Sequence, residues 1–234
     1  MKRIFYRGVN VASWNVDAVL EALTSGNLNG DIEPGMWHKR YPKPIEVAHR
    51  TDLRRELTEI QPRDVWLPAS YACGDLEGAA HYAWKKGAPM GTSVPIIVEF
   101  EVDILATVID GRDSLYSIIH CAHREEACLI IERGWGKAIR PYLDLAAASF
   151  PDNRQFRHAL VDLACTDEEV KSSHYENATM IAGRYNTKFR SAFMVPNKIL
   201  PAAVRRVWIS EDRPTWEADD EMISVPILVR AFAR

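Results

Sequence analysis

The spacing of hydrophobic and polar positions predicts strands along the whole chain. Residues 3–11 alternate in polarity and carry aromatic and β-branched side chains, a pattern typical of a strand. Residues 95–102 alternate even more regularly, with Val98, Phe100 and Val102 on one side. The strands expected from this pattern span residues 3–11, 65–67, 95–102, 104–109, 188–195, 204–209 and 223–232.

Helical periodicity appears mainly in the first half and the middle of the chain. Val16, Val19, Leu20 and Leu23 share one helical face after Asn15, which we expect to be the N-cap. The helices expected from such patterns span residues 16–23, 51–60, 75–86, 153–163 and 167–172, with residues 113–121 and 126–131 ambiguous and 27–50 a long loop. Strands throughout, with no regular strand–helix–strand repeat, predict an α+β fold. No linker divides the chain, so we expect a single domain over residues 1–234.

The composition is that of an ordinary globular protein. Of 234 residues, 47% are apolar and 26% charged, which excludes collagen-like, low-complexity and mostly disordered classes. The four cysteines have no metal-ligand spacing, which favours a reducing compartment. The charged N-terminus lacks a signal-like apolar region, and no apolar run is long enough to span a membrane. We therefore expect a cytoplasmic protein that uses no metal.

Common catalytic motifs are absent. The chain has neither of the glycine-rich phosphate loops G-x-x-x-x-G-K-[ST] and G-x-G-x-x-G, nor the nucleophile motif G-x-S-x-G. His120, Cys121, His123 and Cys128 could ligate a metal, but structural sites usually come as spaced pairs of ligands. The usual kinase, hydrolase and dinucleotide-fold dehydrogenase classes therefore lose most of their support.

Two segments of the predicted strands carry polar residues that could bind a ligand. Arg7 lies inside the first strand, where its guanidinium needs a carboxylate, phosphate or backbone partner unless the strand is an edge that exposes it to solvent. Ser70 and Tyr71 follow the strand 65–67, and strand ends often contact ligands. A turn serine and a core tyrosine are the alternative for this second segment.

Charge is segregated near the C-terminus. From residue 177 to 210 the chain has six basic residues and no acidic one, and residues 211–221 then hold six acidic residues against Arg213. The formal net charge of -3 is therefore not an even mixture of charges, because it includes a purely basic segment and an acidic segment that follows it. A cationic face suits a ligand that carries phosphate, although a solvated surface is the alternative.

Several short motifs, in order along the chain, resemble those of the ADP-ribosyltransferase superfamily. Residues 4–8 (IFYRG) are similar to its first strand, which carries an arginine. Residues 65–70 followed by 78–83 (GAAHYA) look like its middle block, a serine-containing strand before a helix of small residues. Residues 191–196 (SAFMVP) and 204–209 resemble its closing pair of strands.

The resemblance implies a split β-sandwich with flanking helices that binds NAD as a substrate. It implies transfer of ADP-ribose to a macromolecular acceptor, protein or nucleic acid, by a bacterial toxin or phage-defence effector with a possible antitoxin partner. Arg7 would meet the phosphates, Ser70 would brace the nicotinamide pocket, and Tyr71 or Tyr82 would stack on the ring. The residues implied for NAD binding are Tyr6, Arg7, Gly8, Ser70, Tyr71, Tyr82, Arg184, Tyr185 and Ser191, and those implied for catalysis are Arg7, Glu176 and Arg190.

The chain departs from this pattern at the catalytic acid. The closing strand of the family usually carries a glutamate where this sequence has Ala192, and Glu176 is the best substitute, ahead of Glu77 and Glu132. A carboxylate is needed because loss of nicotinamide creates an oxocarbenium-like sugar cation. The alternatives are an NAD glycohydrolase, a phosphate-transferring relative on the same fold, and a module that binds a nucleotide without turnover.

Overall fold

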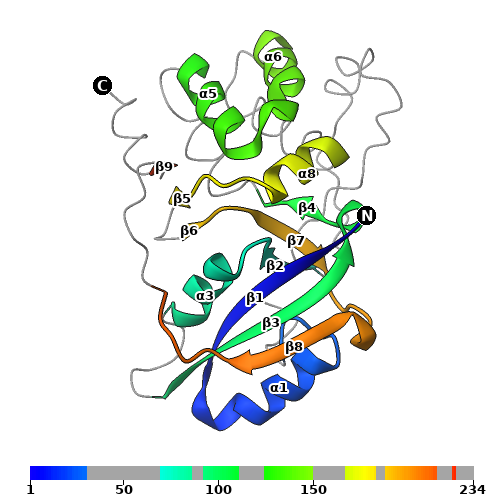
Figure 1. The fold of residues 1–234 in the computed structure, drawn as a ribbon, viewed down its shortest axis with the longest axis vertical. Helices are drawn as coiled ribbons and strands as arrows, with labels where there is room; N and C mark the ends of the chain where they lie inside the picture. The colour runs from blue at the N-terminus through cyan, green and yellow to red at the C-terminus, as the bar shows by residue number, and fades with distance from the viewer. Residues whose placement is uncertain are drawn as a thin grey trace.

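The fold is α+β and is built on a six-stranded antiparallel sheet (Figure 1). The computed structural model describes residues 1–30, 69–85, 92–110, 124–149, 167–182, 188–214 and 223–224. The strand order in the sheet is β4-β7-β2-β1-β3-β8. Its strands are β1 (Lys2–Ala12), β2 (Ala69–Cys73), β3 (Ser93–Asp103), β4 (Val108–Ile109), β7 (Ala192–Pro196) and β8 (Val204–Ile209). A smaller sheet, β6-β5-β9, joins β5 (Ile181–Ala182), β6 (Lys188–Phe189) and β9 (Ile223–Ser224).

The helices flank the large sheet. Helix α3 packs against β1, α1 lies beside β8, and α8 lies between the sheet and the pair α5 and α6 (Figure 1). The α-helices are α1 (Val16–Thr24), α3 (Leu76–Trp84), α5 (Arg124–Trp135), α6 (Arg140–Ser149) and α8 (Glu168–Tyr175). Short 3-10 turns are η1 (Ser13–Asn15), η4 (Ile104–Ala106), η5 (Lys137–Ile139) and η8 (Pro201–Ala203). In the part of the chain described, no helix is long and apolar enough to cross a membrane.

The hydrophobic core centres on the alternating face of β1. Phe5 is fully buried, and its ring lies 5.2 Å from Phe193 of β7 and 6.2 Å from Phe100 of β3, measured between ring centroids. Tyr175, the last residue of α8, contacts the same ring at 5.4 Å and donates a hydrogen bond to the Ile4 carbonyl. These aromatic contacts join three strands and α8 into one core.

Most of the predicted elements that fall on described residues are confirmed, with shifted boundaries. The strands expected at 3–11, 95–102 and 204–209 are β1, β3 and β8. The helix expected at 16–23 is α1, but Asn15 makes no side-chain capping bond. The helices expected at 75–86 and 167–172 are α3 and α8, and they begin after capping residues Asp75 and Asp167. The ambiguous 126–131 lies in α5.

Three strand predictions were wrong in detail. The first half of 104–109 is the turn η4, because the Asp103 carboxylate accepts a bond from the Leu105 N–H and starts a new turn. The expected strand 188–195 is broken into β6 and β7 at Arg190 and Ser191. Ser70 and Tyr71 lie inside β2 and not at a strand end. Residues 31–68, 113–121, 153–163 and 225–232, with the elements expected there, lie outside the described residues.

Candidate functional site

Arg7 lies in the middle of β1, between β2 and β3, so an exposed edge strand is excluded. Its Nε donates to the Leu28 carbonyl at 2.6 Å and its Nη1 to the Tyr71 carbonyl at 2.7 Å. Among the described residues the guanidinium has no carboxylate partner, and its Nη2 makes no hydrogen bond. Burial lowers the pKa of Arg7 to about 10, so the side chain is still a cation at neutral pH.

The guanidinium reaches Tyr71 because β1 and β2 pair only briefly. β1 forms eleven residue pairs with β3 but a single pair, Tyr6 with Cys73, with β2. Beyond that pair the two strands diverge, and the Tyr71 carbonyl, which would otherwise accept from a neighbouring strand, accepts from Arg7. The side chain of Arg7 therefore takes the place of backbone pairing at this junction.

The segment 26–30, which follows α1, supplies the second acceptor for Arg7. Asn197 holds this segment, since its Oδ1 accepts from the Leu28 N–H at 2.8 Å. The buried Ser70 hydroxyl donates to the Asn29 Oδ1. Gly26 adopts a φ of 87° against the Ile199 carbonyl, a position that only glycine fits. Arg7 and Ser70 therefore meet the same segment of backbone from two strands.

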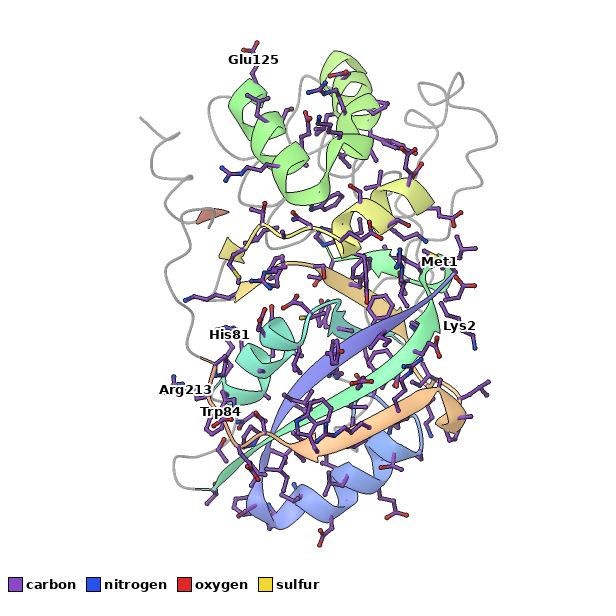
Figure 2. The ribbon with its side chains drawn as sticks, viewed as in Figure 1. Met1, Lys2, His81, Trp84, Glu125 and Arg213 are labelled. Atoms are coloured by element: carbon purple, nitrogen blue, oxygen red, sulfur yellow. The ribbon has the colours of Figure 1, made fainter. Side chains whose placement is uncertain are left out.

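Helix α3 approaches β1 most closely at Gly8. A Cβ on Gly8 would lie 1.8 Å from the Ala79 carbonyl oxygen, so a side chain here would collide with the helix backbone. The other end of α3 is tied to the residue after β8, because Trp84 Nε1 donates to Ser210 Oγ at 3.0 Å. Figure 2 labels Trp84 at this end of the helix. Tyr82, on the same helix, is partly buried and lies under the Lys85 ammonium, 5.7 Å from its ring centroid.

The start of α3 places a carboxylate at the other end of β2. Asp75 Oδ1 accepts from the Gly78 N–H at 2.6 Å, and Oδ2 lies 3.4 Å from the backbone nitrogens of Arg190 and Ser191. Burial raises the pKa of Asp75, and the backbone bonds oppose that shift. Burial raises the pKa of the buried Cys73 thiol, Asp75 and Asp110 raise it further, and Arg7 lowers it. Asp75 and Arg7 therefore both act on this one side chain, together with Asp110.

His174 of α8 holds the first residue of β7. Its Nε2 accepts from the Ala192 N–H at 3.0 Å, so the proton of the neutral ring is on Nδ1, 3.1 Å from the Gly134 carbonyl. Burial lowers the pKa of His174 to about 4. The ring is therefore a neutral structural brace for Ala192, the residue at which the resemblance leads one to expect a glutamate, and both ring nitrogens are occupied.

The structure brings only some of the predicted site residues together. Arg7, Gly8, Ser70 and Tyr71 surround the junction of β1 and β2. Tyr6 points to the opposite face of β1 from Arg7, because side chains alternate, and Glu99 lies near enough to raise its pKa in addition to burial.

Three other predicted residues lie away from Arg7. Glu176 pairs with Arg3, Oε1 to Nη2 at 2.6 Å, and Arg190 pairs with Glu77, Nη1 to Oε2 at 2.7 Å. Ser191 is buried and its Oγ accepts from the Gly74 N–H at 3.1 Å, so it braces the start of α3. Arg184 and Tyr185 lie outside the described residues.

The basic stretch 177–210 does not form one cationic face among the residues described. Arg190 is neutralised by Glu77, and Arg205 by Glu101 at 3.1 Å. Arg206 lies on the edge strand β8, with its guanidinium carbon 4.7 Å from the Trp208 ring centroid. The prediction that this stretch lines a site therefore has no support from these residues.

Two residues of the junction were missed from the sequence. Asn29 belongs to a short Asn- and Gly-rich segment after α1, whose composition indicated only a loop. Asp75 directly precedes a helix, a position where aspartate is favoured as N-cap, and that signal could have marked it. No group of three or more metal-ligating side chains occurs among the described residues.

Comparison of the chain with protein-family models, with curated proteins and with solved structures found no match.

Proposed function

We propose that the protein is an NAD-dependent mono-ADP-ribosyltransferase whose sheet is the split β-sandwich of that superfamily. The observation that carries the proposal is Arg7, a cation between two diverging strands with no carboxylate partner among the described residues. Arg7 is half-buried. A cation partly removed from water without a counter-charge is costly, and an anionic ligand would lower that cost. The place of the arginine in the first strand is also the place that the sequence resemblance predicts.

The chemistry of Arg7 suits the pyrophosphate of NAD. Nε and Nη1 are already held by the carbonyls of Leu28 and Tyr71, which fix the orientation of the guanidinium plane. The unused Nη2 can donate to a phosphate oxygen, and guanidinium–phosphate bonds are among the stronger hydrogen bonds in proteins. Ser70, held by Asn29, would brace the ligand from β2.

The proposed reaction exchanges one bond at the nicotinamide ribose. The bond between C1′ and the nicotinamide nitrogen breaks, and its electron pair leaves with nicotinamide. A lone pair of the protein or nucleic-acid acceptor then forms the new bond to C1′, and the acceptor's proton passes to a base and on to water. Water in place of the acceptor would make the protein an NAD glycohydrolase.

A nucleotide-binding module without turnover is the second candidate, and one observation favours it. The first residue of β7 is Ala192, whose N–H is occupied by His174, and no residue of β7 is acidic. A site with the Arg7 cation but without a catalytic carboxylate would bind NAD and release no nicotinamide.

The test is NAD binding by calorimetry together with nicotinamide release. Arg7→Met should weaken NAD binding at least tenfold, roughly one lost charge-assisted hydrogen bond. Arg206→Met is the matched control, since Arg206 also has no carboxylate partner among the described residues but lies on the edge strand. Equal loss in both variants, or no NAD binding by the unaltered protein, contradicts the proposal. Binding without nicotinamide release supports the second candidate.

A further inference from the structure

We infer that Asp75 is the carboxylate that acts on the ribose in the proposed transfer, an inference that rests on the proposed function and deepens it. The residue lies where β2 ends and α3 begins, beside the start of β7. Asp75 thus lies next to β7, the strand that has no acidic residue.

The two oxygens of Asp75 are held differently. Oδ1 accepts a short bond from the Gly78 N–H, 2.6 Å, and so fixes the carboxylate as the N-cap of α3. Oδ2 lies 3.4 Å from two backbone nitrogens, at the long limit for a hydrogen bond. One oxygen is therefore anchored, while the other has weak partners that a substrate hydroxyl or a reacting proton could replace.

Asp75 and Arg7 are opposite charges that do not pair with each other. Both act on the thiol of Cys73, the residue at the single β1–β2 pair. Among the described residues, Asp75 has only backbone donors and Arg7 only backbone acceptors. NAD has the complementary distribution, with an anionic pyrophosphate at one end and a cationic nicotinamide at the other. The two uncompensated charges therefore fit one molecule laid across the junction.

The three acids that the sequence offered as substitutes, Glu176, Glu77 and Glu132, are each paired with an arginine. Glu176 is 63% exposed and bound to Arg3, and Glu77 is 54% exposed and bound to Arg190. Exposure to water and a guanidinium partner both weaken the field that a carboxylate exerts on a nearby cation. Asp75 is more buried, and its raised basicity also suits the removal of a proton.

In the proposed step the ionised Asp75 stabilises positive charge on C1′ while the bond to nicotinamide breaks. Nicotinamide leaves with the electron pair, and the acceptor's lone pair bonds to C1′. The acceptor's proton moves to Asp75 Oδ2 and from there to water. The products are ADP-ribosylated acceptor, nicotinamide and one proton, and no oxidant or reductant takes part.

Asp75→Asn tests this step, because asparagine also caps helices and removes only the charge. We expect nicotinamide release to fall about 100-fold or more while the Kd for NAD changes less than threefold. Glu77→Gln and Glu176→Gln, the matched controls, should each keep release within threefold of the unaltered protein. Asp75→Asn with more than a third of the original rate overturns the inference and leaves the proposed function intact.

A second variant covers the case in which Asp75→Asn does not fold. Asp75→Ala should be slow in chloride and regain at least tenfold in rate with sodium formate, which supplies a small carboxylate to the space left. No gain with formate in a folded Asp75→Ala protein counts against the inference. An unaltered protein that binds no NAD or releases no nicotinamide contradicts the proposed function, or its catalytic part, and this inference with it.

Discussion

Strand β1 carries two arginines four residues apart, Arg3 and Arg7, and their side chains have different kinds of partner. Arg3 pairs with the Glu176 carboxylate and lies over the Tyr175 ring, its guanidinium carbon 5.2 Å from the ring centroid. Arg7 has two backbone carbonyls and, among the described residues, no counter-charge. The two side chains point to the same face of the strand, roughly 13 Å apart along it.

The difference comes from what covers each end of the strand. The C-terminal end of α8 covers the Arg3 end and brings both an acid and an aromatic ring. The segment 26–30 and β2 cover the Arg7 position and bring only carbonyls. An arginine in a strand is therefore no indication of function by itself. What distinguishes Arg7 is that no described residue supplies a counter-charge.

The largest expected effect on stability is that of a substitution at Gly8, the residue after Arg7, where α3 packs directly on the backbone of β1. Gly8→Ala would place a methyl group 1.8 Å from the Ala79 carbonyl oxygen, and the helix would have to move. We expect the free energy of unfolding to fall by about 4 kcal/mol or more. Urea unfolding measures this, with Lys2→Ala at the exposed end of β1 as control. A loss below 1 kcal/mol would show that α3 is not clamped there.

The second largest expected effect is a pH dependence of the free energy of unfolding, caused by His174 near the Arg3 end of β1. The pKa of His174 is about 4 in the folded protein and 6.5 ordinarily, so the unfolded chain takes up this proton first as pH falls. The free energy of unfolding should therefore decrease between pH 6.5 and pH 4, by about 3 kcal/mol in total.

Urea titrations at several pH values check this prediction. His174→Gln should flatten the decrease, because the titrating ring is gone, whereas His81→Gln should leave it unchanged. The same slope in all three proteins would remove His174 as the cause. Because Tyr175 and Glu176 follow His174, acid should loosen the Arg3 end before the Arg7 position.

A smaller effect is expected from Arg7 on stability. Arg7→Met leaves the carbonyls of Leu28 and Tyr71 without their donor, which should cost about 2 kcal/mol. Arg7→Lys should recover part of this, since an ammonium can reach one carbonyl but not both in a fixed plane. Thermal unfolding of the three proteins gives the order, and a Met variant as stable as the unaltered protein contradicts it.

The smallest effect is expected from the ion pair at the other end. A double-mutant cycle with Arg3→Met and Glu176→Gln should give a coupling free energy below about 1 kcal/mol, because Glu176 is 63% exposed. Raising the salt concentration should reduce it further. A coupling free energy above 2 kcal/mol would mean that Arg3 stabilises the protein more than Arg7 does, contrary to this prediction.

Much of the fold was predictable because its strands follow local patterns. β1 and β3 alternate in polarity, and the helix α1 has one apolar face. The break between β6 and β7 was not predictable, since the sequence of residues 188–195 indicated one continuous strand. It arises where the backbone at Arg190 and Ser191 turns toward the Asp75 carboxylate, a contact between residues far apart in the sequence.

The candidate site was predictable only in part. Arg7 and Ser70 stood out because polar side chains inside strands need partners. The choice of Glu176 rested on its nearness in sequence to the closing strand, whereas the fold turns it toward Arg3. Which charges have counter-charges depends on strand order and on helix positions, and these are set by tertiary packing and not by local sequence.

The single Tyr6–Cys73 pair has a consequence for how the chain can be divided. It joins two groups of three strands, β1-β3-β8 and β4-β7-β2, and each group has strands from both the first and the last part of the chain. Any cut between residues 74 and 191 separates strands of both groups, so neither fragment carries a complete half of the sheet. Two co-expressed fragments would therefore have to assemble to complete either half of the sheet. The same assembly would re-form the β1–β2 junction in which Arg7 binds its two carbonyls.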